Sequence, residues 1–181
     1  MDVTSARPSP EYLRLVATRP RELRRLMVRG ERPDLAHLAG WEHRGTNLPA
    51  TSALLGLRRF IKGFTTDERG AAVGYNKSVP GSDLATPWTP RPQRDGRVAF
   101  APFTVAPVDP EAVDNRHLAA LLLDYGAVPV PERGLAGRLR DYLVRVEPGS
   151  DALLLGQADL ALGSRRITVG WFALERLGPV P

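Results

Sequence analysis

Two long apolar runs near the end of the sequence are separated by only two residues, Gly163 and Ser164. The runs are residues 152–162 (ALLLGQADLAL) and residues 165–176 (RRITVGWFALER). A two-residue loop that begins with glycine is typical of the type II′ turn, which joins neighbouring antiparallel strands. The sequence therefore predicts a β-hairpin here, with Leu162 opposite Arg165.

Extending this register along the hairpin predicts which side chains share a face of the sheet. Leu154, Ala158 and Ala173 fall on one apolar face. On the same face Gly156 falls opposite Trp171, where the missing glycine side chain leaves room for the indole. We therefore expect Gly156 and Trp171 to point together toward an enclosed core.

The segment before the hairpin, residues 138–147 (RLRDYLVRVE), joins it through Pro148-Gly149-Ser150. If only the first two of these residues form the loop, Asp141 turns to the apolar face. A three-residue loop turns Arg140 and Tyr142 there instead. Because burying an unpaired carboxylate is costly, the three-residue loop is favoured.

Short apolar runs separated by turn residues continue upstream and indicate an all-β body. The stretch from Asp83 to Gly96 is rich in proline and shows no period, which predicts a long loop. Residues 117–125 (HLAALLLDY) fit either a helix or a strand, and we choose a strand. In total we predict eight strands, at residues 41–47, 58–65, 71–77, 97–105, 118–125, 138–147, 152–162 and 165–176.

The first forty residues predict three short helices instead. Each begins near a proline, where the missing N–H costs nothing: Ser9-Pro10, Pro20 and Pro33-Asp34. Gly30 and Gly40 are plausible ends of the second and third helices. The chain is thus divided into an N-terminal helical appendage, residues 1–40, and a β domain, residues 41–178.

Composition narrows the class of protein. The chain has 181 residues and no cysteine, which excludes disulfides, thiolate nucleophiles and zinc fingers and leaves a single hydrophobic core to stabilise the fold. No run is long and apolar enough for a membrane span or a secretion signal, so we expect a cytoplasmic protein. His37, His43 and His117 lack ligand spacing, so we expect no metal and no other cofactor.

The formal charge of +5 raises the question of nucleic-acid binding. Residues 1–34 hold eight arginines against five acidic residues, which leaves little excess charge for the β domain. Aromatic and basic residues do not interleave, as they do on single-strand binding surfaces. We therefore expect no nucleic-acid partner.

Eight antiparallel strands after short helices, with tryptophan starting the first strand and arginine ending the last, resemble the calycin group, which comprises the lipocalins and fatty-acid-binding proteins. The resemblance implies a mainly β, eight-stranded barrel in which Arg176 packs across Trp41 near the closed end. Calycins usually carry Gly-x-Trp, whereas here Gly40 directly precedes Trp41. A β-sandwich, with Trp41 capping its core, would show the same alternation of side chains.

An eight-stranded barrel is just wide enough to hold one small ligand. The candidate ligand-binding residues are Arg140, Tyr142, Trp171, Tyr75 and Lys62. Arg140 either pairs with a ligand carboxylate or sits at the rim with a structural acid such as Asp124. Lys62 shares a face with Phe60 and Phe64, although a lysine stem often reaches out to water.

We favour a noncatalytic role, the binding of a small, mainly apolar ligand that can carry a carboxylate. A cofactor-free cyclase or isomerase of specialised metabolism on the same scaffold is the alternative. In a third reading, the arginine-rich N-terminal helices dock on an acidic partner. A homodimer is left open.

Overall fold

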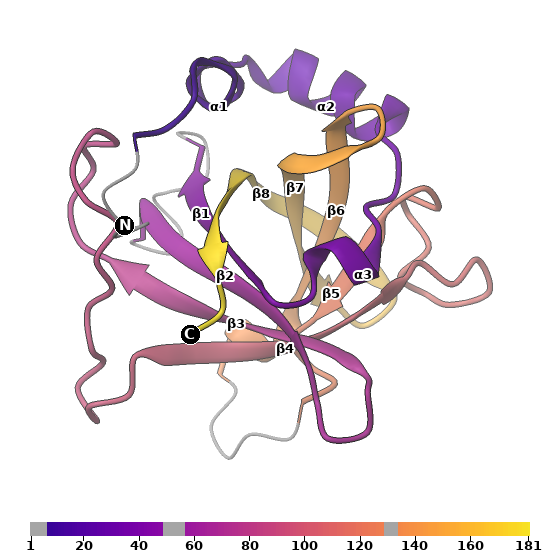
Figure 1. Ribbon diagram of the computed structural model, residues 1–181. Helices are drawn as coiled ribbons and strands as arrows, with labels where there is room; N and C mark the ends of the chain where they lie inside the picture. Colours follow the sequence, from indigo (N-terminus) through magenta and orange to yellow (C-terminus); the bar gives the residue numbers. More distant parts are fainter. Residues whose placement is uncertain (1–6, 49–56, 129–133) are drawn as a thin grey trace.

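The computed structural model describes residues 7–48, 57–128 and 134–181. Eight antiparallel strands pair in sequence order, and the last also pairs with the first, so the sheet closes into a barrel (Figure 1). Closure confirms the predicted barrel and excludes the sandwich. The strands are β1 (Trp41–Asn47), β2 (Arg59–Thr66), β3 (Ala72–Val79), β4 (Ala99–Pro107), β5 (Leu121–Asp124), β6 (Leu139–Glu147), β7 (Ser150–Leu162) and β8 (Arg165–Pro179).

Three short helices precede the barrel, as predicted: α1 (Pro10–Val16), α2 (Pro20–Arg29) and α3 (Leu35–Leu38). The side chains of Ser9 and Asp34 accept hydrogen bonds from backbone N–H groups of the first turns of α1 and α3. One turn of 3₁₀ helix, η2 (Ala136–Arg138), leads into β6. Within the described ranges, no helix is long and apolar enough to cross a membrane.

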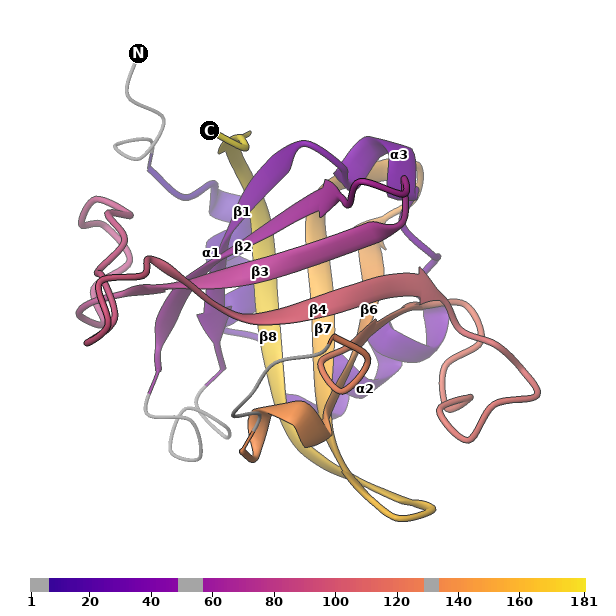
Figure 2. The same ribbon diagram turned by 90° about the horizontal axis from the view of Figure 1, so that it is seen from below.

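Helices α1 and α2 lie along the outside of the barrel, over β6, β7 and β8 (Figures 1 and 2). Tyr12, Leu23 and Met27 are the helix residues that this contact buries most completely. The Tyr12 hydroxyl also lies 2.6 Å from Oγ1 of Thr46 in β1. The barrel residues beneath the helices include Tyr142, Val144, Leu153, Leu155, Trp171 and Ala173.

A second apolar cluster lies inside the barrel. Leu38 from α3 is fully buried in it, so α3 closes one end of the barrel. The strands contribute mainly leucine and phenylalanine side chains near this end. The buried interior residues include Phe64, Phe103, Leu121, Leu123, Leu143, Leu154 and Leu174.

The β7–β8 hairpin begins as predicted, with Leu162 opposite Arg165, but its register shifts at a bulge between Ala158 and Asp159. Beyond the bulge Gly156 lies opposite Phe172, so the predicted pairing of Gly156 with Trp171 is wrong. One extra residue in a strand reverses the faces of all residues that follow. Phe172 consequently faces the barrel interior and Trp171 faces the helices.

The β6–β7 connection also differs from the prediction. Glu147 pairs with Ser150, so the loop has two residues, and a bulge follows between Arg145 and Glu147. Asp141 therefore points into the barrel and Tyr142 points out toward the helices. Burial cost could not decide this register from the sequence, because this part of the sheet is apolar on both faces.

Trp41 and Arg176 meet as expected. The guanidinium carbon of Arg176 lies 4.7 Å from the centre of the Trp41 ring, which is the geometry of a cation–π contact. Arg176 also donates a hydrogen bond to the carbonyl of His37, 3.0 Å away. The pair thus ties both ends of the closed sheet to α3.

The long loop before β4 has no regular structure, as predicted, but it is firmly attached. Trp88 is fully buried against the outside of the barrel, with the Arg59 guanidinium 4.3 Å from its ring centre. Arg59 also donates hydrogen bonds to the carbonyls of Pro80, Thr86 and Pro87. Arg59 therefore anchors the loop by both charge and packing.

Candidate functional site

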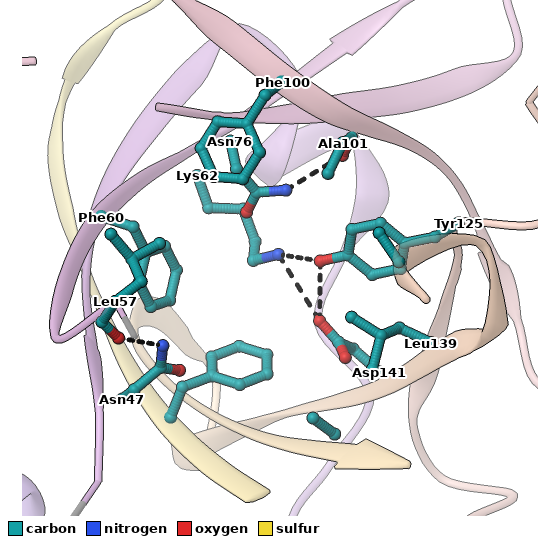
Figure 3. Close-up of a pocket in the computed structure, with 13 residues that line it drawn as sticks. Asn47, Leu57, Phe60, Lys62, Asn76, Phe100, Ala101, Tyr125, Leu139 and Asp141 are labelled. Atoms are coloured by element: carbon teal, nitrogen blue, oxygen red, sulfur yellow. Dashed lines mark hydrogen bonds and ion pairs between the residues drawn. The ribbon is translucent and has the colours of Figure 1, made fainter. Parts of the chain in front are cut away.

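A cavity of about 160 Å³ lies inside the barrel (Figure 3). Its lining includes Asn47, the last residue of β1, whereas α3 directly precedes the first residue of that strand. Cavities of this size hold a ligand as large as a benzene ring. Most of the wall is apolar, and three ionisable or phenolic groups, Lys62, Tyr125 and Asp141, face one another within it. Asn47 and Asn76 add amide groups.

Two aromatic rings of the wall lie flat against neighbouring strands. Phe172 packs over Gly156 and Phe60 packs over Gly45, and a side chain at either glycine would collide with the ring. The two rings meet edge to face, with their centres 5.9 Å apart. Because glycine lets each ring lie back, the centre of the barrel stays open.

A chain of hydrogen bonds joins the polar groups of the cavity (Figure 3). Lys62 Nζ donates to the Tyr125 hydroxyl oxygen at 2.6 Å, and that hydroxyl donates to Asp141 Oδ2 at 2.9 Å. Lys62 Nζ also lies 3.5 Å from the same carboxylate oxygen. The three residues come from β2, β6 and the end of β5, so barrel closure is what brings them together.

Burial controls the protonation of this cluster. Loss of solvent lowers the pKa of Lys62 to about 8, although the nearby Asp141 opposes the change. The same loss of solvent raises the pKa of Asp141, against the effect of Lys62. Burial, followed by the charge of Asp141, raises the pKa of Tyr125 well above its ordinary value. Near neutral pH the cluster is a buried Lys–Asp ion pair bridged by a neutral phenol.

The second carboxylate oxygen of Asp141, Oδ1, is buried and has no hydrogen-bond partner among the described residues. Unsatisfied buried acceptors are uncommon and costly in folded proteins. Ala101, which also lines the cavity, has a φ of 43°, a strained value for a residue with a side chain. Its carbonyl accepts a hydrogen bond from Asn76 at 3.0 Å. Neither the unsatisfied acceptor nor the strained backbone is explained by packing of the core, so both favour a functional role for this cavity.

A second cavity of about 460 Å³ adjoins the first. Phe100, Ala101, Tyr125 and Ala136 line both cavities. Tyr75 lines only the second, and its hydroxyl donates to Glu42 at 2.7 Å. Of the five residues predicted to bind a ligand, Lys62 therefore lines the barrel cavity and Tyr75 lines its neighbour.

The other three predicted ligand-binding residues lie elsewhere. Tyr142 and Trp171 are buried under α1 and α2, outside the barrel. Arg140 forms ion pairs with Asp124 at 2.9 Å and with Asp114 at 3.3 Å. The pairing with Asp124 is the structural alternative that the sequence suggested.

Sequence reasoning missed Tyr125 and Asp141 as site residues. Neighbouring residues of a strand face opposite ways, so neither Asp141 in β6 nor Tyr125 at the end of β5 shares a face with the polar residue next to it in the sequence. The signal available in the sequence is that Asp141 alternates with Leu139 and Leu143, so it shares one face of the strand with two apolar side chains. A lone carboxylate in an apolar row needs a partner from another strand.

No protein-family model, no curated protein and no solved structure matches this chain.

Proposed function

We propose that the protein binds a small, mainly apolar ligand in the barrel cavity, with one polar group of the ligand directed at Lys62, Tyr125 and Asp141. The observation that carries this proposal is a mainly apolar cavity inside the barrel with a convergent polar cluster at one side. Such a combination is the usual form of a small-molecule site. At about 160 Å³ the space suits a ligand built on one ring or a short branched chain.

The charges of the cluster favour a neutral polar group over a carboxylate. Lys62 already has a counterion in Asp141, 3.5 Å away. A bound carboxylate would add a second buried negative charge beside Asp141 and raise the cost of burial. A carbonyl oxygen can accept a hydrogen bond from Lys62, and a hydroxyl group can donate a hydrogen bond to Asp141 Oδ1.

Binding can be tested with toluene and benzyl alcohol, monitored by chemical-shift changes in the labelled protein. We expect shifts confined to residues around the cavity and a Kd on the order of 1 mM or tighter, given the few atoms involved. Benzyl alcohol should bind more tightly than toluene, because its hydroxyl can reach the polar cluster. Shifts scattered over the surface, or none, would refute the proposal.

Ala158 provides a matched pair of variants. Ala158→Leu places bulk inside the cavity and should abolish binding. Ala152→Leu puts the same bulk on an exposed site of the same strand and should leave binding unchanged.

A proton-transfer enzyme is the second candidate, supported by the hydrogen-bond chain from Lys62 through Tyr125 to Asp141. A base and an acid held together in a desolvated site can move a proton next to a carbonyl group. The test is deuterium uptake at the α-carbon of phenylacetone in D₂O. Uptake faster than with Lys62→Met would indicate catalysis, and recovery of unchanged ligand would indicate binding alone.

The calycin relationship is also a proposal. The contact between Trp41 and Arg176 supports it, because the last strand of a calycin supplies the arginine that covers the tryptophan of the first. Closure of eight strands in sequence order supports it as well.

A further inference from the structure

The chain has only two lysines, and they lie in contrasting environments. The Nζ atom of Lys77 pairs with Glu42 at 2.5 Å, on the outside of the barrel. The side chain of Lys62 is 2% exposed and lines the cavity. A reagent that reaches Lys62 must therefore enter the barrel.

We propose that Lys62 binds an aldehyde or ketone ligand covalently, as a reversible imine between its Nζ atom and the carbonyl carbon. This inference rests on the proposed function, because the apolar part of the ligand must occupy the cavity. It further specifies the polar group of the ligand as a carbonyl.

The chemistry requires no other reactant. The neutral amine of Lys62 attacks the carbonyl carbon and the C=O π electrons move to oxygen; nitrogen then loses one proton and oxygen takes one up, which gives a neutral carbinolamine. Oxygen takes up a second proton and leaves as water as the C–O bond breaks, while the nitrogen lone pair forms the C=N bond and nitrogen loses its second proton. The sum is one carbonyl compound and one amine giving one imine and one water.

The polar cluster can supply and remove these protons. The hydrogen-bond chain lets the Lys62 ammonium pass a proton through Tyr125 to Asp141, which leaves a neutral amine and a neutral carboxylic acid. That acid can then protonate the departing oxygen. Within the Lys62–Tyr125–Asp141 cluster, Asp141 Oδ1 is buried and has no hydrogen-bond partner among the described residues, so it has free hydrogen-bonding capacity.

Burial also favours the reactive form of the amine. With its pKa lowered to about 8, roughly 10% of Lys62 is neutral at pH 7. For an ordinary lysine with a pKa of 10.5 the neutral share is only about 0.03%. The nucleophile is therefore about 300 times more abundant than at an exposed site.

The cavity is suited to the positive charge of a protonated imine as well. The Lys62 nitrogen lies 4.5 Å from the ring centre of Phe103 and 5.3 Å from that of Phe172. Aromatic faces attract a cation that has lost its water shell. These rings and Asp141 would stabilise the iminium where they now stabilise the ammonium.

The experiment treats the full-length protein with benzaldehyde and sodium cyanoborohydride, which reduces an imine to a stable benzylamine. Peptide mass mapping then locates the benzyl group. We expect Lys62 to be labelled at least 10-fold faster than Lys77. The rate at Lys62 should rise with pH up to about 8 and then level off, as the amine becomes fully neutral.

Two variants separate chemistry from access. Tyr125→Phe keeps the ring but breaks the hydrogen-bond chain, so labelling of Lys62 should slow by about 10²-fold. Ala136→Trp adds bulk at the η2 wall of the cavity and should block labelling while Lys62 itself is unchanged. Labelling of Lys77 should be unaffected in both.

The outcomes distinguish this inference from the function on which it rests. If benzyl alcohol and benzaldehyde both bind in the cavity but Lys62 is not labelled, the imine is refuted and the binding function stands. Equal labelling of Lys62 and Lys77 also refutes the imine, because it shows only general amine reactivity. If neither compound binds, the proposed function fails first. Binding and labelling are compared on the native chain, so this comparison does not depend on a Lys62 variant that folds.

Discussion

The ammonium nitrogen of Lys62 lies 3.5 Å from the carboxylate of Asp141, although their strands, β2 and β6, are on opposite sides of the barrel. Both side chains are almost completely shielded from solvent. Each charge therefore depends on the other, because neither has water to replace its partner. The contact also joins two halves of the sheet that share no backbone hydrogen bonds.

Removing one member of this pair should destabilise the protein more than removing both. We expect Lys62→Met or Asp141→Leu alone to lower the free energy of unfolding by about 3 to 5 kcal/mol at pH 7, because a lone buried charge remains. The double variant Lys62→Met/Asp141→Leu should lose less than either single variant, because no unpaired charge remains. Urea denaturation measures this difference. Additive losses would show that the pair is not coupled.

His43 should make the fold sensitive to acid. It is completely buried inside the barrel, and burial, followed by the charge of Arg176, lowers the pKa of its imidazole to about 3. In the unfolded chain His43 takes up a proton near pH 6.5. The contribution of neutral His43 to the free energy of unfolding is therefore fully present above that pH and is lost as the pH falls toward 3. By pH 5 the loss is about 2 kcal/mol.

The check on His43 compares the free energy of unfolding at pH 7.5 and pH 5. His43→Phe cannot take up a proton and should show a drop about 2 kcal/mol smaller than the native protein. The comparison between pH values removes any constant packing cost of the phenyl ring. Equal drops in both proteins would contradict the prediction.

The Trp41–Arg176 contact should be measurable by a double-mutant cycle. We expect a coupling energy of about 0.5 to 2 kcal/mol between Trp41→Leu and Arg176→Met, as for other cation–π pairs. Thermal or urea unfolding of the four proteins gives this value. A coupling near zero would mean that Arg176 acts only through its hydrogen bond to His37.

Gly156→Ala should be destabilising because the new methyl group would collide with the ring of Phe172. We expect a loss of about 1 to 3 kcal/mol, typical of overpacking. Gly156→Ala combined with Phe172→Leu should recover part of that loss, since the smaller side chain can move aside. If the double variant is less stable than the sum of the singles predicts, the collision is not the cause.

The contact of α2 with the barrel can be tested on two residues of the same helix. Leu23 is 1% exposed and Val28 is 75% exposed. Leu23→Ala should lower the free energy of unfolding by about 2 to 5 kcal/mol, whereas Val28→Ala should change it by less than about 0.5 kcal/mol. Similar effects at both sites would contradict the observed packing of the helix.

Much of the fold could be predicted from the sequence because its signals are local. Proline near helix starts, the Gly163-Ser164 turn and the alternation of short runs each act over a few residues. The contact of Arg176 with Trp41 followed from a resemblance at the two ends of the barrel. These features depend little on how the middle of the sheet is aligned.

The candidate site could be predicted only in part because it depends on register. The register of β7 and β8 shifts by one residue near Asp159, which exchanges the inner and outer faces of β8 beyond that point. In β6 the faces were reversed because the loop to β7 has two residues and not three; the shift near Arg145 is of two residues and leaves the faces unchanged. Lys62 lies on the predicted face of β2, because no bulge separates it from Phe60 in that strand. Tyr142 and Asp141 exchanged places, because helices cover the outer face there and make it as apolar as the core.

Because α3 closes one end of the barrel, a ligand cannot pass through the interior from one end to the other. The proposed ligand would have to leave by the end through which it entered, and a second ligand could bind only after the first had left. Exchange kinetics should then be set by the departure rate alone, at any concentration of competitor. An elongated guest would also be oriented by this geometry, since whichever end enters first is the end that reaches Lys62.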